Sequence, residues 1–163
     1  MKLVKPTFSM KEAVLDYIKE SGDGDESIFP PFSKSYEEWL EIVHRFETEP
    51  GSGLVKASTY FLVDDAGKIF GDVNIRYKLN KTLLRRGGHI GYGIRPSERQ
   101  KGYATKMLEM ALPIAKELGI ERALITCDKN NIGSAKTIIN NGGVLESEVY
   151  EPDRVTQRYW VIT

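Results

Sequence analysis

The sequence predicts an α/β fold with a mixed β-sheet, built as one domain over residues 1–163. Apolar residues recur at helical spacing in four segments, and short apolar runs bounded by turn residues lie between them. Residues 89–127 have the order strand, helix, strand, which favours two parallel strands joined by a right-handed crossover. A chain of 163 residues is also of single-domain size and can bury its own core.

The N-terminal part predicts two helices and then an antiparallel hairpin. The first helix covers residues 10–18 and the second covers 35–46, where Ser35 and Glu38 have the spacing of a capping box. Two β-type runs, 59–63 and 68–77, flank the turn sequence Asp64-Asp65-Ala66-Gly67. This pattern is typical of two antiparallel strands joined by a short turn.

The rest of the chain alternates strands with helices. A strand over 89–95 ends at Pro96, and a turn over 97–101 leads into a helix over 104–118. Gly119 is suited to end this helix, and Pro113 inside it predicts a kink. A buried strand follows over 122–127 and a short helix over 131–140. Two strands, near 144–150 and 156–162, complete the predicted elements.

Composition excludes several classes of protein. The chain has 23 basic and 23 acidic residues, and a net charge of zero is unfavourable for non-specific nucleic-acid binding. The apolar runs are too short for a membrane span, and the single cysteine, Cys127, excludes an internal disulfide. One cysteine and two histidines make a metal cluster unexpected. We expect a cytoplasmic protein without a metal and without a nucleic-acid or membrane partner.

The most informative motif is Arg99-Gln100-Lys101-Gly102-Tyr103-Ala104, between a predicted strand and a predicted helix. The first N–H groups of a helix lack partners and attract anions, and small residues let phosphate oxygens approach the backbone. The surrounding segment, 78–106, is basic with Glu98 as its only acid, which suits a small polyanion. A turn with a glycine is the alternative. A Rossmann fingerprint and a Walker loop are both absent.

This motif resembles the central motif of the GNAT superfamily of N-acetyltransferases, Gln/Arg-x-x-Gly-x-Gly/Ala, through Arg99, Gly102 and Ala104. The resemblance extends over residues 60–145 and includes a second signature, Asn-x-x-Ser, that begins at Asn131. It implies a mostly antiparallel sheet with helices on both faces. It also implies a central parallel pair, the predicted strands 89–95 and 122–127, that splays apart around the cofactor.

The resemblance implies acetyl-coenzyme A as cosubstrate and an amine of a small molecule or peptide as acceptor, and it leaves a homodimer open. Backbone amides of the loop would hold the pyrophosphate. The strand over 93–95 would pair with the pantetheine arm, with an amide near Ile94 facing the thioester carbonyl. Asn131 and Ser134 would contact the cofactor, or else only cap their helix. The expected cofactor-binding residues are Ile94, Arg99, Gln100, Lys101, Gly102, Tyr103, Ala104, Thr105, Asn131 and Ser134.

The resemblance is less informative about proton transfer. Family members often have a tyrosine four residues after the serine of the second signature as general acid, and here Ile138 stands there. An alkylamine is protonated at pH 7, so a base would help, and His89 is the candidate. A histidine bonded to neighbouring backbone is the alternative for His89. We expect Glu98 to be solvated and Cys127 to be a small core residue rather than an acyl carrier.

We therefore expect an N-acyltransferase that moves an acetyl group from acetyl-coenzyme A directly to an amine in a ternary complex. A coenzyme A-binding regulatory module without catalysis and a partner-binding domain that keeps only the fold are the alternatives. The acidic first fifty residues favour a cationic or amine-bearing acceptor. Four aromatic residues either line an acceptor pocket or pack in the core: Phe29, Phe32, Tyr36 and Trp39.

Overall fold

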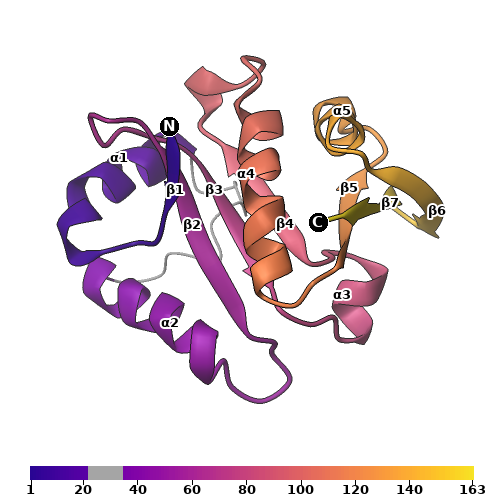
Figure 1. Ribbon diagram of the computed structural model, residues 1–163, viewed down its shortest axis with the longest axis horizontal. Coiled ribbons are helices and arrows are strands. Elements are labelled where there is room, and N and C mark those ends of the chain that lie inside the picture. The colour runs from indigo at the N-terminus through magenta and orange to yellow at the C-terminus, as the bar shows by residue number, and fades with distance from the viewer. Residues whose placement is uncertain (22–34) are drawn as a thin grey trace.

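Two antiparallel sheets form the β-structure of the protein, which a computed structural model describes for residues 1–21 and 35–163 (Figure 1). The larger sheet has the strand order β1-β2-β3-β4 and the smaller has the order β5-β7-β6. The strands of the larger sheet are β1 (Lys2–Val4), β2 (Ala57–Val63), β3 (Ile69–Arg76) and β4 (Ile90–Ile94). Those of the smaller are β5 (Arg122–Asp128), β6 (Val144–Glu151) and β7 (Arg154–Ile162).

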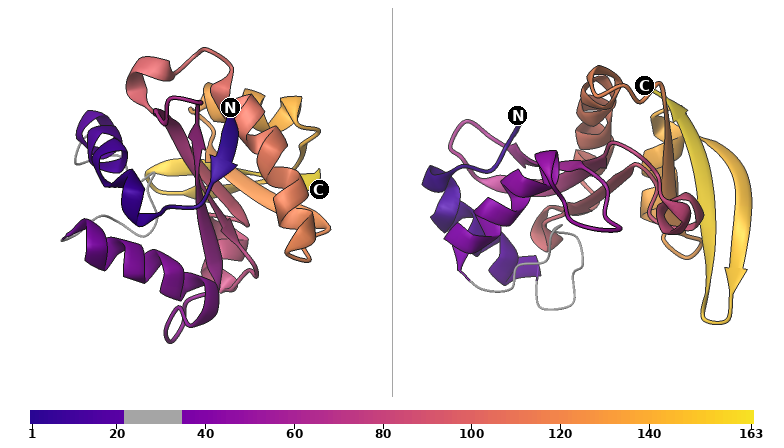
Figure 2. Two further views of the ribbon diagram at one scale, coloured as in Figure 1. Left: turned by 60° about the vertical axis from the view of Figure 1, so that its left-hand side comes forward. Right: turned by 90° about the horizontal axis from the view of Figure 1, so that it is seen from below.

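Helices cover both faces of the larger sheet, as the resemblance implied (Figures 1 and 2). The pleat explains this division, because Phe61 of β2 packs with one cluster of apolar residues and Leu62, the next residue, packs with the other. Phe61 meets α1 (Lys11–Ser21) and α2 (Tyr36–Thr48), while Leu62 meets α4 (Tyr103–Glu117). The other helical elements are η1 (Phe8–Met10), α3 (Lys81–Arg85), η2 (Pro96–Glu98) and α5 (Ile132–Asn140).

Local sequence signals set several element ends. The Ser35 side chain accepts from the Glu38 N–H, and the Glu38 carboxylate accepts from the Ser35 N–H, so the capping box is confirmed. Gly119 ends α4 with φ of 85°, and Ile120 N–H donates to Ala115 O in the pattern of a helix C-cap. The helix continues through Pro113, and the kink there stays a prediction. The antiparallel hairpin of β2 and β3 is also confirmed.

One strand and one α-helix were not predicted, besides the two short 3-10 helices η1 and η2. β1 has three residues, too few for an alternating pattern, and becomes a strand by pairing with the edge of β2. α3 lies in the basic segment and has five residues, with the Asn80 side chain accepting from Leu83 N–H as its cap. Neither element carries the long apolar periodicity on which sequence-based prediction depends.

The sheets meet where β4 begins. His89 N–H donates to Leu124 O at 2.7 Å, and Leu124 N–H donates to His89 Nδ1 at 2.9 Å. Gly88 permits this approach, since its φ is 63° and a side chain there would collide with the Leu124 carbonyl. β4 and β5 nevertheless belong to different sheets. The central parallel pair is therefore not confirmed as a hydrogen-bonded ladder.

The aromatic residues of α2 belong to the core. Tyr36 and Trp39 are buried against β2, so packing explains both, while Phe29 and Phe32 lie outside the described residues. Within residues 1–21 and 35–163, no helix is both long and apolar enough to cross a membrane. The same residues contain no group of three or more His, Cys, Asp or Glu side chains that could hold a metal ion.

Candidate functional site

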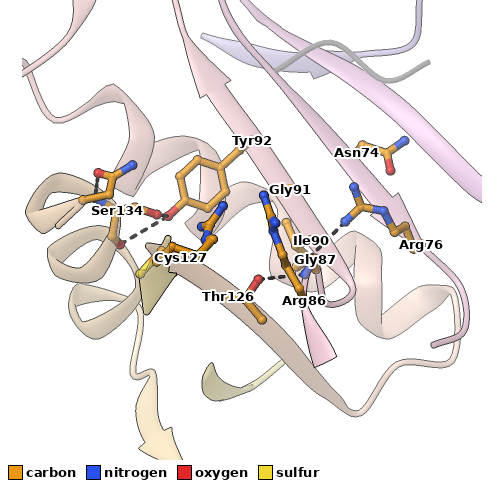
Figure 3. A pocket seen from close by; sticks show the side chains of 12 residues that line it. Asn74, Arg76, Arg86, Gly87, Ile90, Gly91, Tyr92, Thr126, Cys127 and Ser134 are labelled. Carbon is orange, nitrogen blue, oxygen red and sulfur yellow. Dashed lines mark hydrogen bonds between the residues drawn. The ribbon is translucent and has the colours of Figure 1, made fainter. Parts of the chain in front are cut away.

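A cavity of about 290 Å³ lies between the two sheets, close to their junction (Figure 3). Its wall combines β3, the loop before β4, β4, β5, and the first residues of α5 and β7. The cavity is therefore built from segments that are far apart in the sequence. The described lining residues are Asn74, Arg76, Arg86, Gly87, Ile90, Gly91, Tyr92, Thr126, Cys127, Asn131, Ser134 and Arg154.

β4 is an edge strand whose outer backbone groups face away from β3. Arg95 N–H donates to Phe70 O at 2.9 Å, so the backbone groups of Arg95 point toward β3. Because the facing alternates in an antiparallel ladder, the N–H groups of Tyr92 and Ile94 point outward. Ile94 O already accepts from Arg99 Nε at 3.0 Å. The predicted position of Ile94, with its amide on the open edge of the strand, agrees with this register.

The loop before α4 has a left-handed backbone at two positions. Gln100 has φ of 61° and Gly102 has φ of 85°. A Cβ on Gly102 would meet no atom within 4 Å, so the space beside it is open. The Lys106 N–H donates to Gly102 O, and the three preceding amides therefore lie ahead of the helical ladder. These amides belong to Tyr103, Ala104 and Thr105.

Ion pairs organise the charged side chains of this loop. Glu98 is only 8% exposed and accepts from Lys68 Nζ at 2.5 Å and from Lys101 Nζ at 2.9 Å. These two bonds hold the pKa of Glu98 below its usual value. The expectation that Glu98 is solvated is therefore wrong, because two lysines compensate its burial. Lys101 also donates to Ser97 O, whereas Arg99 is exposed.

The first residues of α4 contribute their side chains to packing. The Tyr103 ring packs at a tilt against Phe70 with 4.8 Å between ring centroids, and Ala104 packs against the main core. Thr105 O accepts from Asn141 Nδ2 at 3.1 Å. These contacts fix the start of the helix, so that its backbone amides are the groups left to meet a ligand.

Asn131 and Ser134 are the predicted site residues that line the cavity. The Asn131 side chain accepts from Ser134 N–H at 3.0 Å and so caps α5, the structural role foreseen for it. Ser134 Oγ lies 2.9 Å from Tyr92 Oη (Figure 3). Sequence reasoning did not select Tyr92, although strand alternation places it on the same face as Ile90 and Ile94. Burial raises the pKa of Tyr92 to about 12, which keeps its phenol protonated.

His89 lies at the sheet junction and is not among the residues that line the cavity. Its Nδ1 accepts from the Leu124 backbone, which leaves the proton of the neutral ring on Nε2. Burial, with the nearby Arg76 charge, lowers the pKa of His89. A ring with one nitrogen bonded and the other protonated has no free lone pair for a base. The geometry thus supports the structural alternative, and a catalytic role for His89 stays a prediction.

Two further side chains bear on the mechanism. Cys127 lines the cavity, but burial raises the pKa of its thiol and disfavours the nucleophilic thiolate. Its side chain also belongs to the main core, as expected. Ile138 is fully buried in that core, so the position often held by a tyrosine in the family contributes no polar group here.

Three arginines give the cavity wall a positive charge: Arg76, Arg86 and Arg154. The described lining residues include no Asp, Glu or His. Arg86 lies in the basic segment that sequence reasoning noted. Arg76 ends β3, just before that segment, and Arg154 begins β7, far from it in the chain. The sequence alone carries no signal that joins the three arginines.

The sequence also matches a known protein family. The family model described as an acetyltransferase (GNAT) domain matches residues 11–144. The chain belongs to the GNAT acetyltransferase family, and its class is that of an acetyl-coenzyme A-dependent N-acetyltransferase. A search of curated proteins finds no match.

Solved structures share the fold. A mutant of the spermidine N-acetyltransferase SpeG from Vibrio cholerae superposes with a TM-score of 0.70 at 14% identity, over 99% of this chain and 95% of that one. The ribosomal-protein-S5-alanine acetyltransferase from Vibrio fischeri gives a TM-score of 0.73 at 18% identity, over 98% and 91%. At these identities the likeness defines the fold and leaves the acceptor undefined.

Proposed function

We propose that the protein transfers an acetyl group from acetyl-coenzyme A directly to an amine that enters the cavity beside β4. The observation that supports this most is the open edge of β4, whose outward amides lie on the strand that also lines the cavity. Acetyl-coenzyme A, when bound, supplies an acetyl group activated as a thioester. An extended arm can pair with the edge of a strand, as a further strand would.

The residues present fit the parts of this cosubstrate. The amides that precede the α4 ladder, with Arg99 beside them, suit a pyrophosphate, and the open space at Gly102 permits its approach. The outward N–H groups of Tyr92 and Ile94 suit the amide carbonyls of the pantetheine arm. Asn131 and Ser134 form the opposite wall of the cavity.

Proton transfer involves few groups of the wall. The Tyr92 phenol stays protonated at the cavity, and its O–H can donate a hydrogen bond to a leaving thiolate, which takes its proton from water. No carboxylate or imidazole lines the cavity in the described part of the chain, so the amine proton passes to water. The protonated thiol of Cys127 favours direct transfer over an acyl-enzyme.

The acceptors named for the similar structures are both amines but differ in charge and size. One protein is named for spermidine and the other for an alanine of a ribosomal protein. They support an amine acceptor here and give no reason to prefer either compound.

Initial-rate kinetics with acetyl-coenzyme A and a panel of amines tests the proposal. We expect release of the coenzyme A thiol, with intersecting double-reciprocal plots that indicate a ternary complex. Cys127→Ala should keep the turnover of the folded protein. Parallel plots together with a dead Cys127→Ala variant would establish an acyl-enzyme instead. Binding of acetyl-coenzyme A without turnover on any amine would favour the regulatory module.

A further inference from the structure

We infer that the acceptor amine carries an anionic group, a carboxylate or a phosphate, close to the nitrogen that is acetylated. This inference rests on the proposed function and specifies its substrate class. The cavity places three guanidinium groups around the space where the acceptor would enter, and its described lining holds no acid. The wall therefore attracts an anion and repels an additional cation.

Arg76 is held in place at the start of β4. Its Nη1 donates to Gly87 O at 3.1 Å and to Gly88 O at 3.3 Å. Its Nη2 would lie 3.3 Å from a Cβ built on Gly91, so the guanidinium rests directly on the strand. Figure 3 shows Arg76 and Asn74 side by side at this end of the cavity. The position of this charge is thus fixed before any ligand arrives.

Arg86 and Arg154 add charge from two other segments. Arg86 is exposed, follows α3, and forms no ion pair within residues 1–21 and 35–163. Arg154 lies 3.4 Å from the Asp128 carboxylate through Nη2, whereas its buried Nε has no partner among the described residues. Arg86 therefore presents the cation that is most accessible to a ligand. A guanidinium binds carboxylates and phosphates with two parallel hydrogen bonds.

The same charges affect the reacting nitrogen. Nearby cations lower the pKa of a bound ammonium group, which raises the fraction of neutral amine that can attack. That effect matters in a cavity whose described wall offers no base. Two acids of the N-terminal segment, Asp16 and Glu20, are paired with Arg95. The described lining of the cavity contains no residue of that segment. Of the two kinds of acceptor that the acidic N-terminal segment favours, cationic or amine-bearing, the cavity wall suits the amine-bearing one.

Matched acceptors test the inference. Alanine is compared with alaninamide, and O-phosphoethanolamine with ethanolamine, with spermidine as a polycationic probe. We expect kcat/KM to be at least about tenfold higher for the member that carries the anionic group than for its partner that lacks it. The two pairs distinguish a carboxylate from a phosphate as the preferred group. Added salt should reduce the advantage.

Arg86→Gln locates the effect, and Arg85→Gln is the matched control because Arg85 is adjacent, exposed and paired with Glu151. Arg86→Gln should raise KM about tenfold for the acceptor that carries the anionic group. KM for the partner without that group, and the acetyl-coenzyme A affinity measured by calorimetry, should change little. Arg85→Gln should leave both KM values and the acetyl-coenzyme A affinity unchanged.

Three results would overturn the inference. Equal or higher kcat/KM for the amines without an anionic group, or for spermidine, would refute it while the proposed function stands. A loss of acetyl-coenzyme A affinity in Arg86→Gln would assign this arginine to the cosubstrate. Turnover on none of these amines, with acetyl-coenzyme A bound, would refute the proposed function and the inference with it.

Discussion

At the scale of single residues, His89 illustrates how a group with suitable chemistry can have a structural role. Its ring Nδ1 accepts from the Leu124 N–H, and its backbone N–H donates to the Leu124 carbonyl. One residue thus closes the junction between the two sheets. The sequence places a histidine on the central strand, which suggests a base. Only the packing of β5 against β4 shows that Nδ1 is already bonded.

His89→Gln should reduce stability at neutral pH and leave turnover of the folded protein within a few-fold of wild type. The lowered pKa of His89 means that the unfolded chain, with a value near 6.5, takes up its proton first as the pH falls. Folding stability from this group is thus present above about pH 6.5 and is lost as the pH falls below it. In denaturation experiments between about pH 5 and 8, the free energy of unfolding should vary less with pH in the variant than in wild type.

His44→Gln is the control for the loss of a histidine, since His44 is the other histidine of the chain and is exposed on α2. A drop in turnover of about 10²–10⁴-fold in folded His89→Gln, with loss of an ascending limb near pH 6–7, would restore His89 as the base.

At the scale of elements, two glycines at opposite ends of α4 separate strain from ligand binding. Gly102 and Gly119 both have φ of 85°, and a Cβ on either would meet no atom within 4 Å. Valine should strain both positions alike. Only Gly102→Val should weaken the binding of acetyl-coenzyme A, with a Kd at least about tenfold higher in calorimetry. Equal affinities in the two folded variants would remove the loop from the cofactor site.

The same scale shows how far the sequence predicts this structure. α2, α4 and the hairpin of β2 and β3 follow from periodicity, caps and turn residues, all of which are local in the chain. β1 and α3 are too short to show periodicity and depend on neighbours for their stability. The loop that we propose for the cofactor is a contiguous motif, so it could be recognised in the sequence. The cavity could not, because Arg154 of the smaller sheet meets Arg76 and Tyr92 of the larger sheet only through the packing of the two sheets.

At the scale of the whole molecule, one core joins the two sheets. The main cluster includes Ile90 of the larger sheet, Ala123 and Tyr159 of the smaller, and Met107 of α4. At the facing edges, β4 and β5 are joined by a backbone hydrogen bond between His89 and Leu124. Beyond that bond, residues of both strands line the cavity. A ligand lying between the sheets would add contacts to both.

Acetyl-coenzyme A should therefore stabilise the whole fold rather than one loop. At a free concentration of 100 times Kd, a ligand that binds only the native state adds about 2.7 kcal/mol to the free energy of unfolding. For a chain of 163 residues this corresponds to a rise in Tm of roughly 5–10 °C.

At the same concentration the Gly102→Val variant, with tenfold weaker binding, should gain only about half as much, whereas Gly119→Val should show the full rise. Differential scanning calorimetry measures both, and a single cooperative transition that moves as a unit is the expected result. If the heat absorption instead split into two transitions, with only one shifted by the ligand, the two sheets would be unfolding independently and the cosubstrate would contact only one of them.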